Sequence, residues 1–152
     1  MKKIVFSVLI VMISVFSTQA QEVAIKAGVT YSNASSVINE SFGYMFGATF
    51  IEGNLELTGD FNYYMDNQGD QLYTPYAFNL DGRYILLNKG KFQMYPMLGI
   101  NLSNFHGIEM GLNVGAGSRY TVSPKLSVFS DLKYTFGSMD GTSINLGIQL
   151  RP

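Results

Sequence analysis

The chain has 152 residues, which is enough for one domain. Its formal net charge of -1 at pH 7 gives no electrostatic reason to expect binding to nucleic acid. It contains no cysteine, which excludes disulfides, thiolate catalysis and thiolate metal sites. Only 14% of its residues are charged, against roughly 25% in ordinary soluble domains, and Tyr and Phe supply all of its aromatic residues.

The amino terminus has the composition of a secretory signal peptide. Two lysines precede an apolar run over residues 4–16, and small residues follow at Thr18 and Ala20, as at a cleavage site. An uncleaved membrane anchor is the alternative, but this run is shorter than the ~20 residues that a spanning helix needs. We therefore predict a signal peptide over residues 1–20, removed after Ala20, and one domain over residues 21–152.

After this segment, apolar and polar residues alternate in one stretch after another, which is typical of β-strands with one apolar and one polar face. The predicted strands cover residues 22–31, 41–50, 55–64, 76–86, 92–102, 110–122, 126–136 and 144–151. Many of them are longer than the ~5 to 6 residues of a typical globular strand. They match the ~9 to 11 residues that cross a bilayer at a tilt.

The predicted connections alternate between longer loops and turns of a few residues. The loops cover residues 32–40, 65–72, 103–109 and 137–142, and the turns cover residues 52–54, 88–90 and 123–125. An antiparallel barrel with both termini on one side produces this alternation, with short turns facing the periplasm and loops facing outward. The chain is therefore predicted to be all-β, an eight-stranded antiparallel up-and-down transmembrane β-barrel.

Two prolines bear on these strand assignments. Pro75 precedes a predicted strand, where a missing amide is tolerated. Pro96 lies inside the predicted strand at residues 92–102, where it removes one hydrogen bond of the ladder. We therefore expect a bulge at Pro96.

The placement of charge indicates which face lines the interior. A soluble, lipocalin-like barrel would carry its apolar face inside and need a richly charged exterior. Here the charged residues of the predicted strands lie on the polar face, beside many glycines, which suits the crowded lumen of a small barrel. We predict a lumen network of paired charges. Its expected members are Lys26, Glu56, Asp60, Asp81, Arg83, Arg119, Asp131, Lys133 and Arg151.

The apolar face carries aromatic residues near the ends of its strands. Such rings at the two rims of an apolar band are favoured at membrane interfaces. The predicted interface aromatics are Tyr31, Phe42, Tyr63, Tyr76, Tyr84, Tyr120 and Phe136.

Four segments carry a resemblance to a known family: AIKAGVTYSN at residues 24–33, YPMLGIN at 95–101, LNVGAG at 112–117 and KYTFG at 133–137. Together with the signal peptide, they resemble the small porin-like and OmpX-like outer-membrane β-barrel proteins of Gram-negative bacteria. The resemblance covers the whole chain after the signal. It implies export to the outer membrane, contact with outer-membrane lipid and lipopolysaccharide, and insertion as a monomer by the barrel-assembly machinery. It implies little about activity.

Catalytic and nucleotide-binding chemistry is sparsely represented. His106, the single histidine, lies near Ser103 and Glu109 in a predicted loop, a grouping that would suit a lipid hydrolase. No second feature of a nucleophile site supports that grouping, so a solvated loop histidine is favoured. The glycines at residues 115–117 lie within a strand with no helix after it, which favours lumen packing over phosphate binding. We expect no enzyme activity and no cofactor.

Acidic residues dominate the predicted outer loops. Asp66, Asn67 and Asp70 lack the spacing of a calcium-binding loop, so no metal site is predicted there. Acidic loops beside anionic lipopolysaccharide would repel it unless divalent cations bridge the two. The expected outer-loop acids are Glu40, Asp66, Asp70, Glu109 and Asp140.

These patterns favour a structural or interaction protein of the outer membrane, with a lumen filled by side chains and short acidic loops at the cell surface. An extracellular partner is compatible with this role, although the sequence does not identify one. A small-molecule binding or transport barrel, porin-like or lipocalin-like, is the alternative, and large lumen cavities would favour it. A lipid-modifying enzyme is a third and weaker hypothesis.

Overall fold

The computed structural model describes residues 22–34, 38–65, 75–104, 108–137 and 140–152, so the predicted signal peptide lies outside the described residues. Its strands are β1 (Glu22–Ala34), β2 (Ile38–Glu52), β3 (Leu55–Met65), β4 (Tyr76–Tyr84), β5 (Leu87–Lys89), β6 (Phe92–Asn104), β7 (Ile108–Ser123), β8 (Leu126–Gly137) and β9 (Gly141–Leu150). No helix in the described part of the chain is both long and apolar enough to cross a membrane.

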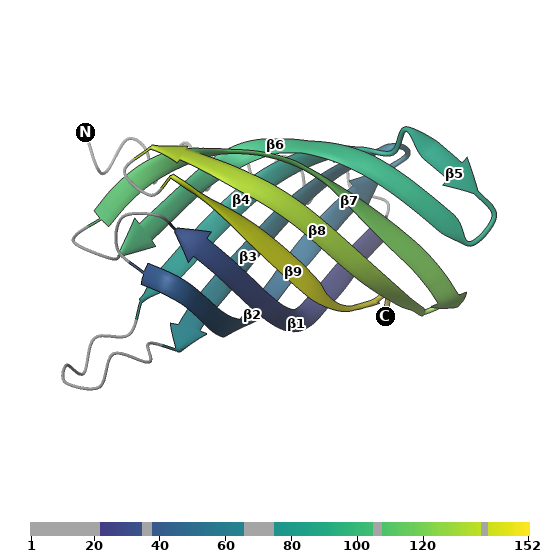
Figure 1. Cartoon of the computed structure of the whole chain (residues 1–152). Helices are drawn as coiled ribbons and strands as arrows, with labels where there is room; N and C mark the ends of the chain where they lie inside the picture. The colour runs from purple at the N-terminus through teal and green to yellow at the C-terminus, as the bar shows by residue number, and fades with distance from the viewer. Residues whose placement is uncertain (1–21, 35–37, 66–74, 105–107, 138–139) are drawn as a thin grey trace.

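Eight of these strands close into a barrel. Each pairs antiparallel with its neighbours in the chain, β4 pairs with β6, and β9 pairs with β1 to close the ring. Figure 1 shows the strongly tilted strands around one axis, with β5 extending beyond one end of the barrel. The predicted all-β, eight-stranded antiparallel up-and-down barrel is confirmed.

The expected bulge at Pro96 occurs on the neighbouring strand. The register between β6 and β7 runs unbroken past Pro96. On the other side of β6, Arg83 pairs with Met97 and Leu87 pairs with Met94. One more residue therefore lies between these pairs on β4 and β5 than on β6. The strand predicted at residues 76–86 ends at Tyr84, and β5 occupies part of the turn predicted at residues 88–90.

The direction of the backbone amides explains where the extra residue falls. The carbonyl of Met94 accepts a hydrogen bond from the Leu86 amide at 3.0 Å, so alternation along β6 directs the nitrogen of Pro96 toward β4 as well. Because proline has no amide hydrogen, the ladder to β4 loses a bond there. On the other side of this segment, the Ile85 amide donates to the carbonyl of Asn54 at 2.8 Å, one position beyond the last β3–β4 pair.

The strands continue further at the loop end of the barrel than the sequence indicated. β1 ends at Ala34, β2 begins at Ile38, and β6 and β7 pair as far as Asn104 and Ile108. The segments predicted as loops at residues 32–40 and 103–109 are therefore largely strand. The side chains in these segments are mostly polar, so the sequence shows no alternation of apolar and polar residues there. Hydrogen bonds between backbones can still form, because they do not depend on such alternation.

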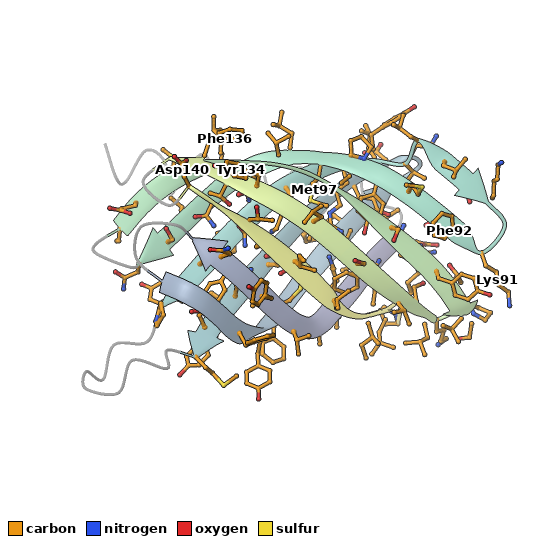
Figure 2. All side chains as sticks on the ribbon, in the orientation of Figure 1. Lys91, Phe92, Met97, Tyr134, Phe136 and Asp140 are labelled. Carbon is orange, nitrogen blue, oxygen red and sulfur yellow. The ribbon has the colours of Figure 1, made fainter. Side chains whose placement is uncertain are left out.

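The two faces of the barrel have opposite chemistry, as predicted. The largest fully buried side chains include Lys26, Arg83, Arg119 and Lys133, all in the lumen. Leu98 and Met110 are both 64% exposed on the outer face. In Figure 2, Phe136 and Asp140 lie toward the loop end, and Lys91 and Phe92 lie at the turn end.

Candidate functional site

The centre of the lumen is a charge cluster around Asp131 of β8. Its Oδ2 accepts hydrogen bonds from Lys26 Nζ at 3.1 Å and Arg83 Nη2 at 2.8 Å. Its Oδ1 accepts one from the Tyr95 hydroxyl at 2.8 Å. These partners come from β1, β4 and β6 respectively, so the cluster spans the barrel interior and one carboxylate ties four strands together.

A second cluster is formed around Lys133, two residues along β8. Its ammonium lies 3.1 Å from Asp81 Oδ2 and 3.6 Å from Asp60 Oδ1. The amide of Asn79 donates to Asp60 at 2.8 Å, and the amide of Asn113 donates to both Asn79 and Asp81 at 2.9 Å. Asn113 therefore satisfies the Asp81 oxygen that Lys133 leaves open, whereas Asn79 and Lys133 share one oxygen of Asp60.

A third cluster lies toward the turn end, around Arg119 of β7. Its guanidinium forms an ion pair with Glu56, donating from two nitrogens to the two carboxylate oxygens. It also donates to Gln93 at 2.9 Å and Gln149 at 3.0 Å. Both charged side chains are 1% exposed, so this forked pair is buried as well as geometrically specific.

Together the three clusters contain eight of the nine residues expected in the lumen network. They hold four cations, Lys26, Arg83, Arg119 and Lys133, and four carboxylates, Glu56, Asp60, Asp81 and Asp131. All eight are buried. Equal numbers of opposite charges are what a desolvated interior requires, because an unpaired buried charge is strongly destabilising.

Arg151, the ninth expected member, lies outside these clusters. It forms an ion pair with Glu22 at 3.2 Å, and the two side chains are 30% and 53% exposed. Residue 151 follows the last residue of β9, at the mouth of the barrel, where water reaches both charges. The pair therefore belongs to the rim of the lumen.

Five uncharged residues also belong to the clusters, although charge placement did not identify them. They are Asn79, Gln93, Tyr95, Asn113 and Gln149. Their position on the inward, alternating face was readable from the sequence. Which carboxylate each one contacts was not, because that depends on the stagger between strands.

Inward glycines supply the space that these side chains occupy. A Cβ added at Gly117 would lie 2.5 Å from the Tyr95 ring and would also clash with the Asp131 carboxylate. A Cβ at Gly99 would clash with the Asp81 carboxylate. Neighbouring side chains therefore fill the room left by these two glycines.

Two hollows lie at opposite ends of the lumen. The one at the turn end is about 210 Å³ and is lined by Glu22, Ile51, Gly53, Asn54, Glu56, Ile85, Asn88, Gln93, Arg119 and Arg151. The one at the loop end is about 20 Å³, with Asn62, Asn79 and Asn101 in its lining. The Asp131 cluster has no residue in the second hollow and lies between the two ends.

The seven predicted interface aromatics lie on the outer wall at two levels. Tyr84 and Tyr120 lie toward the turn end. The other five lie toward the loop end, where the rings of Tyr31 and Phe42 are 5.0 Å apart. The exposed fractions of Phe42, Tyr63, Tyr76, Tyr84, Tyr120 and Phe136 range from 37% to 59%.

The predicted outer acids are placed unevenly. Asp66 and Asp70 lie outside the described residues. Glu40 and Glu109 are in β2 and β7, which corrects their assignment to loops, and Glu109 pairs with Ser103 across the ladder. Asp140 precedes β9 and accepts a hydrogen bond from the Gly137 amide at 2.9 Å.

The candidate hydrolase grouping is only partly described. His106 falls outside the described residues, and Ser103 is buried facing the lumen at 3% exposure. Among the residues that the structure describes, no group of three or more His, Cys, Asp or Glu side chains could hold a metal ion.

The fold closely resembles bacterial outer-membrane barrels. The N-terminal β-barrel domain of Pseudomonas aeruginosa OprF superposes with a TM-score of 0.67 at 18% identity, over 88% of this chain and 100% of that one. Neisserial surface protein A gives 0.66 at 16% identity, over 86% and 96%. Ail, the attachment invasion locus protein of Yersinia pestis, gives 0.60 at 11% identity, over 86% and 97%. Neither a protein-family model nor a curated protein sequence matches this chain.

Proposed function

We propose that this protein is an integral outer-membrane barrel with a closed lumen, and that it acts as a structural or interaction protein by presenting its loops at the cell surface. The outer wall supports the membrane location, because large apolar side chains such as Leu98 and Met110 face outward with most of their surface exposed. The similarity to solved outer-membrane barrels supports the same location. Fold by itself does not specify activity.

The position of Asp131 is the observation that best supports a closed lumen. Its carboxylate contacts Lys26, Arg83 and Tyr95, which come from three other strands. An ion crossing the lumen would have to separate these pairs. Removing one partner of a buried pair costs about 3 to 5 kcal/mol, so we expect the clusters to oppose conduction. Eight strands also enclose a lumen that side chains can fill, whereas water-filled porins have about sixteen.

Single-channel recording tests this proposal directly. The purified protein, reconstituted in planar bilayers in molar salt, should show no stable conductance steps. Correct insertion is checked in the same preparation by protection of the strands from added protease. Reproducible steps that disappear in Gly115→Leu or Gly117→Leu, in variants that still insert, would contradict the closed lumen and favour transport.

Small-molecule binding is a second candidate function because of the hollow at the turn end. Its volume of about 210 Å³ lies below the ~300 to 1,000 Å³ of most ligand pockets. Its charged side chains include two existing pairs, Glu22 with Arg151 and Glu56 with Arg119. Ligand would have to compete with those pairs, so the structural role is favoured.

The remaining expectations have their own tests. Amino-terminal sequencing of protein extracted from membranes should return Gln21 and not Met1.

Chelation should weaken attachment of lipopolysaccharide to the purified barrel if divalent cations bridge it to the outer acids. Loss of a lipid-hydrolysing activity in His106→Ala would instead support the enzyme hypothesis.

Insertion as a monomer by the barrel-assembly machinery is part of the same proposal. In cells depleted of that machinery, the protein should fail to insert into the outer membrane. Cross-linking in intact membranes should give only the molecular mass of a monomer.

A further inference from the structure

The outer wall of the barrel contains an apolar hollow near the end that carries the short turns. It measures about 350 Å³ and is bounded by β2, β3, β4 and β6. Its outward-facing lining residues are Phe50, Glu52, Leu55, Leu57, Gly82, Tyr84, Pro96 and Leu98. The remaining lining residues, Glu56, Arg83 and Met97, have side chains buried in the lumen. The hollow therefore opens on the outer wall, and two members of the lumen clusters lie behind it.

Gly82 leaves the hollow open. It lies on the outward row between Leu57 of β3 and Leu98 of β6, with which it pairs directly. The nearest atom to a Cβ built at Gly82 is the carbonyl oxygen of Leu98, at 3.6 Å. The outward positions around the hollow, such as Leu55, Tyr84 and Leu98, carry large side chains, so the missing side chain at Gly82 leaves a depression between them.

The chemistry of the lining favours an acyl chain as occupant. Most of the surface that lines the hollow is apolar, and the volume of the hollow falls at the lower end of the ~300 to 1,000 Å³ range of ligand pockets. A wall facing lipid has no water to fill a dry apolar void, and a void without partner atoms forfeits dispersion contacts. A flexible hydrocarbon chain restores those contacts.

Glu52 adds a headgroup preference at the rim of the hollow. It is the last residue of β2, and its side chain is exposed beside the turn to β3. Among the described residues, no cation forms an ion pair with it. The other short turns carry Lys89, Lys91 and Lys125, so this acidic rim is local.

We propose that the hollow binds one phospholipid from the leaflet at the turn end, with an acyl chain against Leu57, Gly82 and Leu98 and an ethanolamine ammonium against Glu52. An ammonium with N–H donors can form a charge-assisted hydrogen bond to this carboxylate. A choline headgroup has no such donor, and an anionic glycerol headgroup is repelled. The inference rests on the membrane location proposed above.

A tryptophan reporter can measure this binding, since the chain contains no tryptophan. Tyr84→Trp places the fluorophore in the wall of the hollow, and Tyr63→Trp places it on the outer wall near the opposite end. Each variant is reconstituted in choline-lipid vesicles that contain a small fraction of ethanolamine lipid with brominated chains. The Tyr84→Trp reporter should be quenched several-fold more than the bulk fraction of brominated lipid predicts. The Tyr63→Trp reporter should be quenched only in proportion to that bulk fraction.

Two matched glycine substitutions locate the site. Gly82→Leu fills the hollow and should abolish the excess quenching of the Tyr84→Trp reporter. Gly59→Leu should leave it unchanged, because Gly59 is also in the outer wall but not in the lining, and a Cβ there meets only Phe78 at 3.8 Å. Glu52→Gln should make brominated ethanolamine and choline lipids quench equally, while the acyl chain still binds.

The reporters also separate the two proposals. If both reporters are quenched in proportion to the bulk fraction of brominated lipid, the barrel lies in the membrane but the hollow has no preferred lipid. That result overturns the lipid-binding inference and leaves the membrane location standing. Quenching of the Tyr63→Trp reporter with protection of the Tyr84→Trp reporter means that protein covers the hollow, for example a second copy, and overturns it too. Quenching of neither overturns the membrane location as well.

Discussion

Glycines on the two faces of the same barrel meet opposite surroundings. Gly117 faces the lumen, where an added Cβ would collide with Tyr95 and Asp131. Gly59 faces outward, where an added Cβ would lie 3.8 Å from one ring atom. The comparison shows that the lumen is specified by shape and charge together, whereas the outer wall is constrained mainly by polarity.

The largest effect is expected from removing the carboxylate at the centre of the lumen. Asp131→Leu leaves Lys26 and Arg83 buried without their shared partner, which should lower the free energy of unfolding by about 3 to 5 kcal/mol. Urea unfolding of the protein in lipid vesicles measures the change. Asp140→Leu, which removes an exposed carboxylate near the loops, is the control. An unchanged midpoint for Asp131→Leu would mean that the cluster contributes nothing to stability.

Arg119→Leu tests the same principle in the cluster toward the turn end. The substitution leaves Glu56 without its charged partner, and a loss of similar size, about 3 to 5 kcal/mol, is expected. The double variant Arg119→Leu with Glu56→Leu should recover part of that loss, because it removes the stranded charge as well. A double variant less stable than the sum of its parts would contradict the pairing.

A charge on the outer wall should have the next largest effect. Leu132 is adjacent to Asp131 in β8 but points outward, with 53% of its surface exposed. Leu132→Arg should cost ~2 to 4 kcal/mol in lipid if the position lies near the bilayer midplane. Leu132→Ala separates loss of the apolar side chain from the cost of the charge. Equal stability of Leu132→Arg and Leu132→Ala in vesicles would argue against lipid contact.

The glycine pair should give a smaller but sharper difference. Gly117→Leu overfills the lumen beside Tyr95 and should destabilise by about 1 to 3 kcal/mol. Gly59→Leu, on the open outer wall, should stay within about 0.5 kcal/mol of the unsubstituted protein. Both are measured as shifts in the same urea transition. If the two variants were equally stable, the lumen would be looser than these contacts indicate.

The smallest effect is expected at the mouth of the barrel. Arg151 and Glu22 form an ion pair at 3.2 Å, but both side chains are partly exposed. Exposed pairs contribute about 0 to 1 kcal/mol and weaken as salt is added. Arg151→Gln should therefore shift the unfolding midpoint slightly at low salt and not at all in molar salt. A loss as large as that of Arg119→Leu would place Arg151 in the buried network after all.

Local alternation was enough to predict the barrel and most of the lumen network. Residues such as Lys26 and Asp131 were assigned inward because successive side chains on a strand point to opposite faces. Strand limits at the loop end were underestimated, because the polar residues there pair through their backbones. The division between β4 and β5 was also missed, since the disturbance caused by Pro96 appears on its neighbour.

The sequence by itself determined which residues face the lumen and which face outward, because a two-residue period is a property of each strand alone. Only the tertiary structure decided which inward residues meet. Asp131 finds Lys26, Arg83 and Tyr95 because closure and stagger bring four strands to one level, and those depend on pairing around the whole ring. The outer hollow has the same origin: Gly82 is a gap only because the register places Leu57 and Leu98 on either side of it.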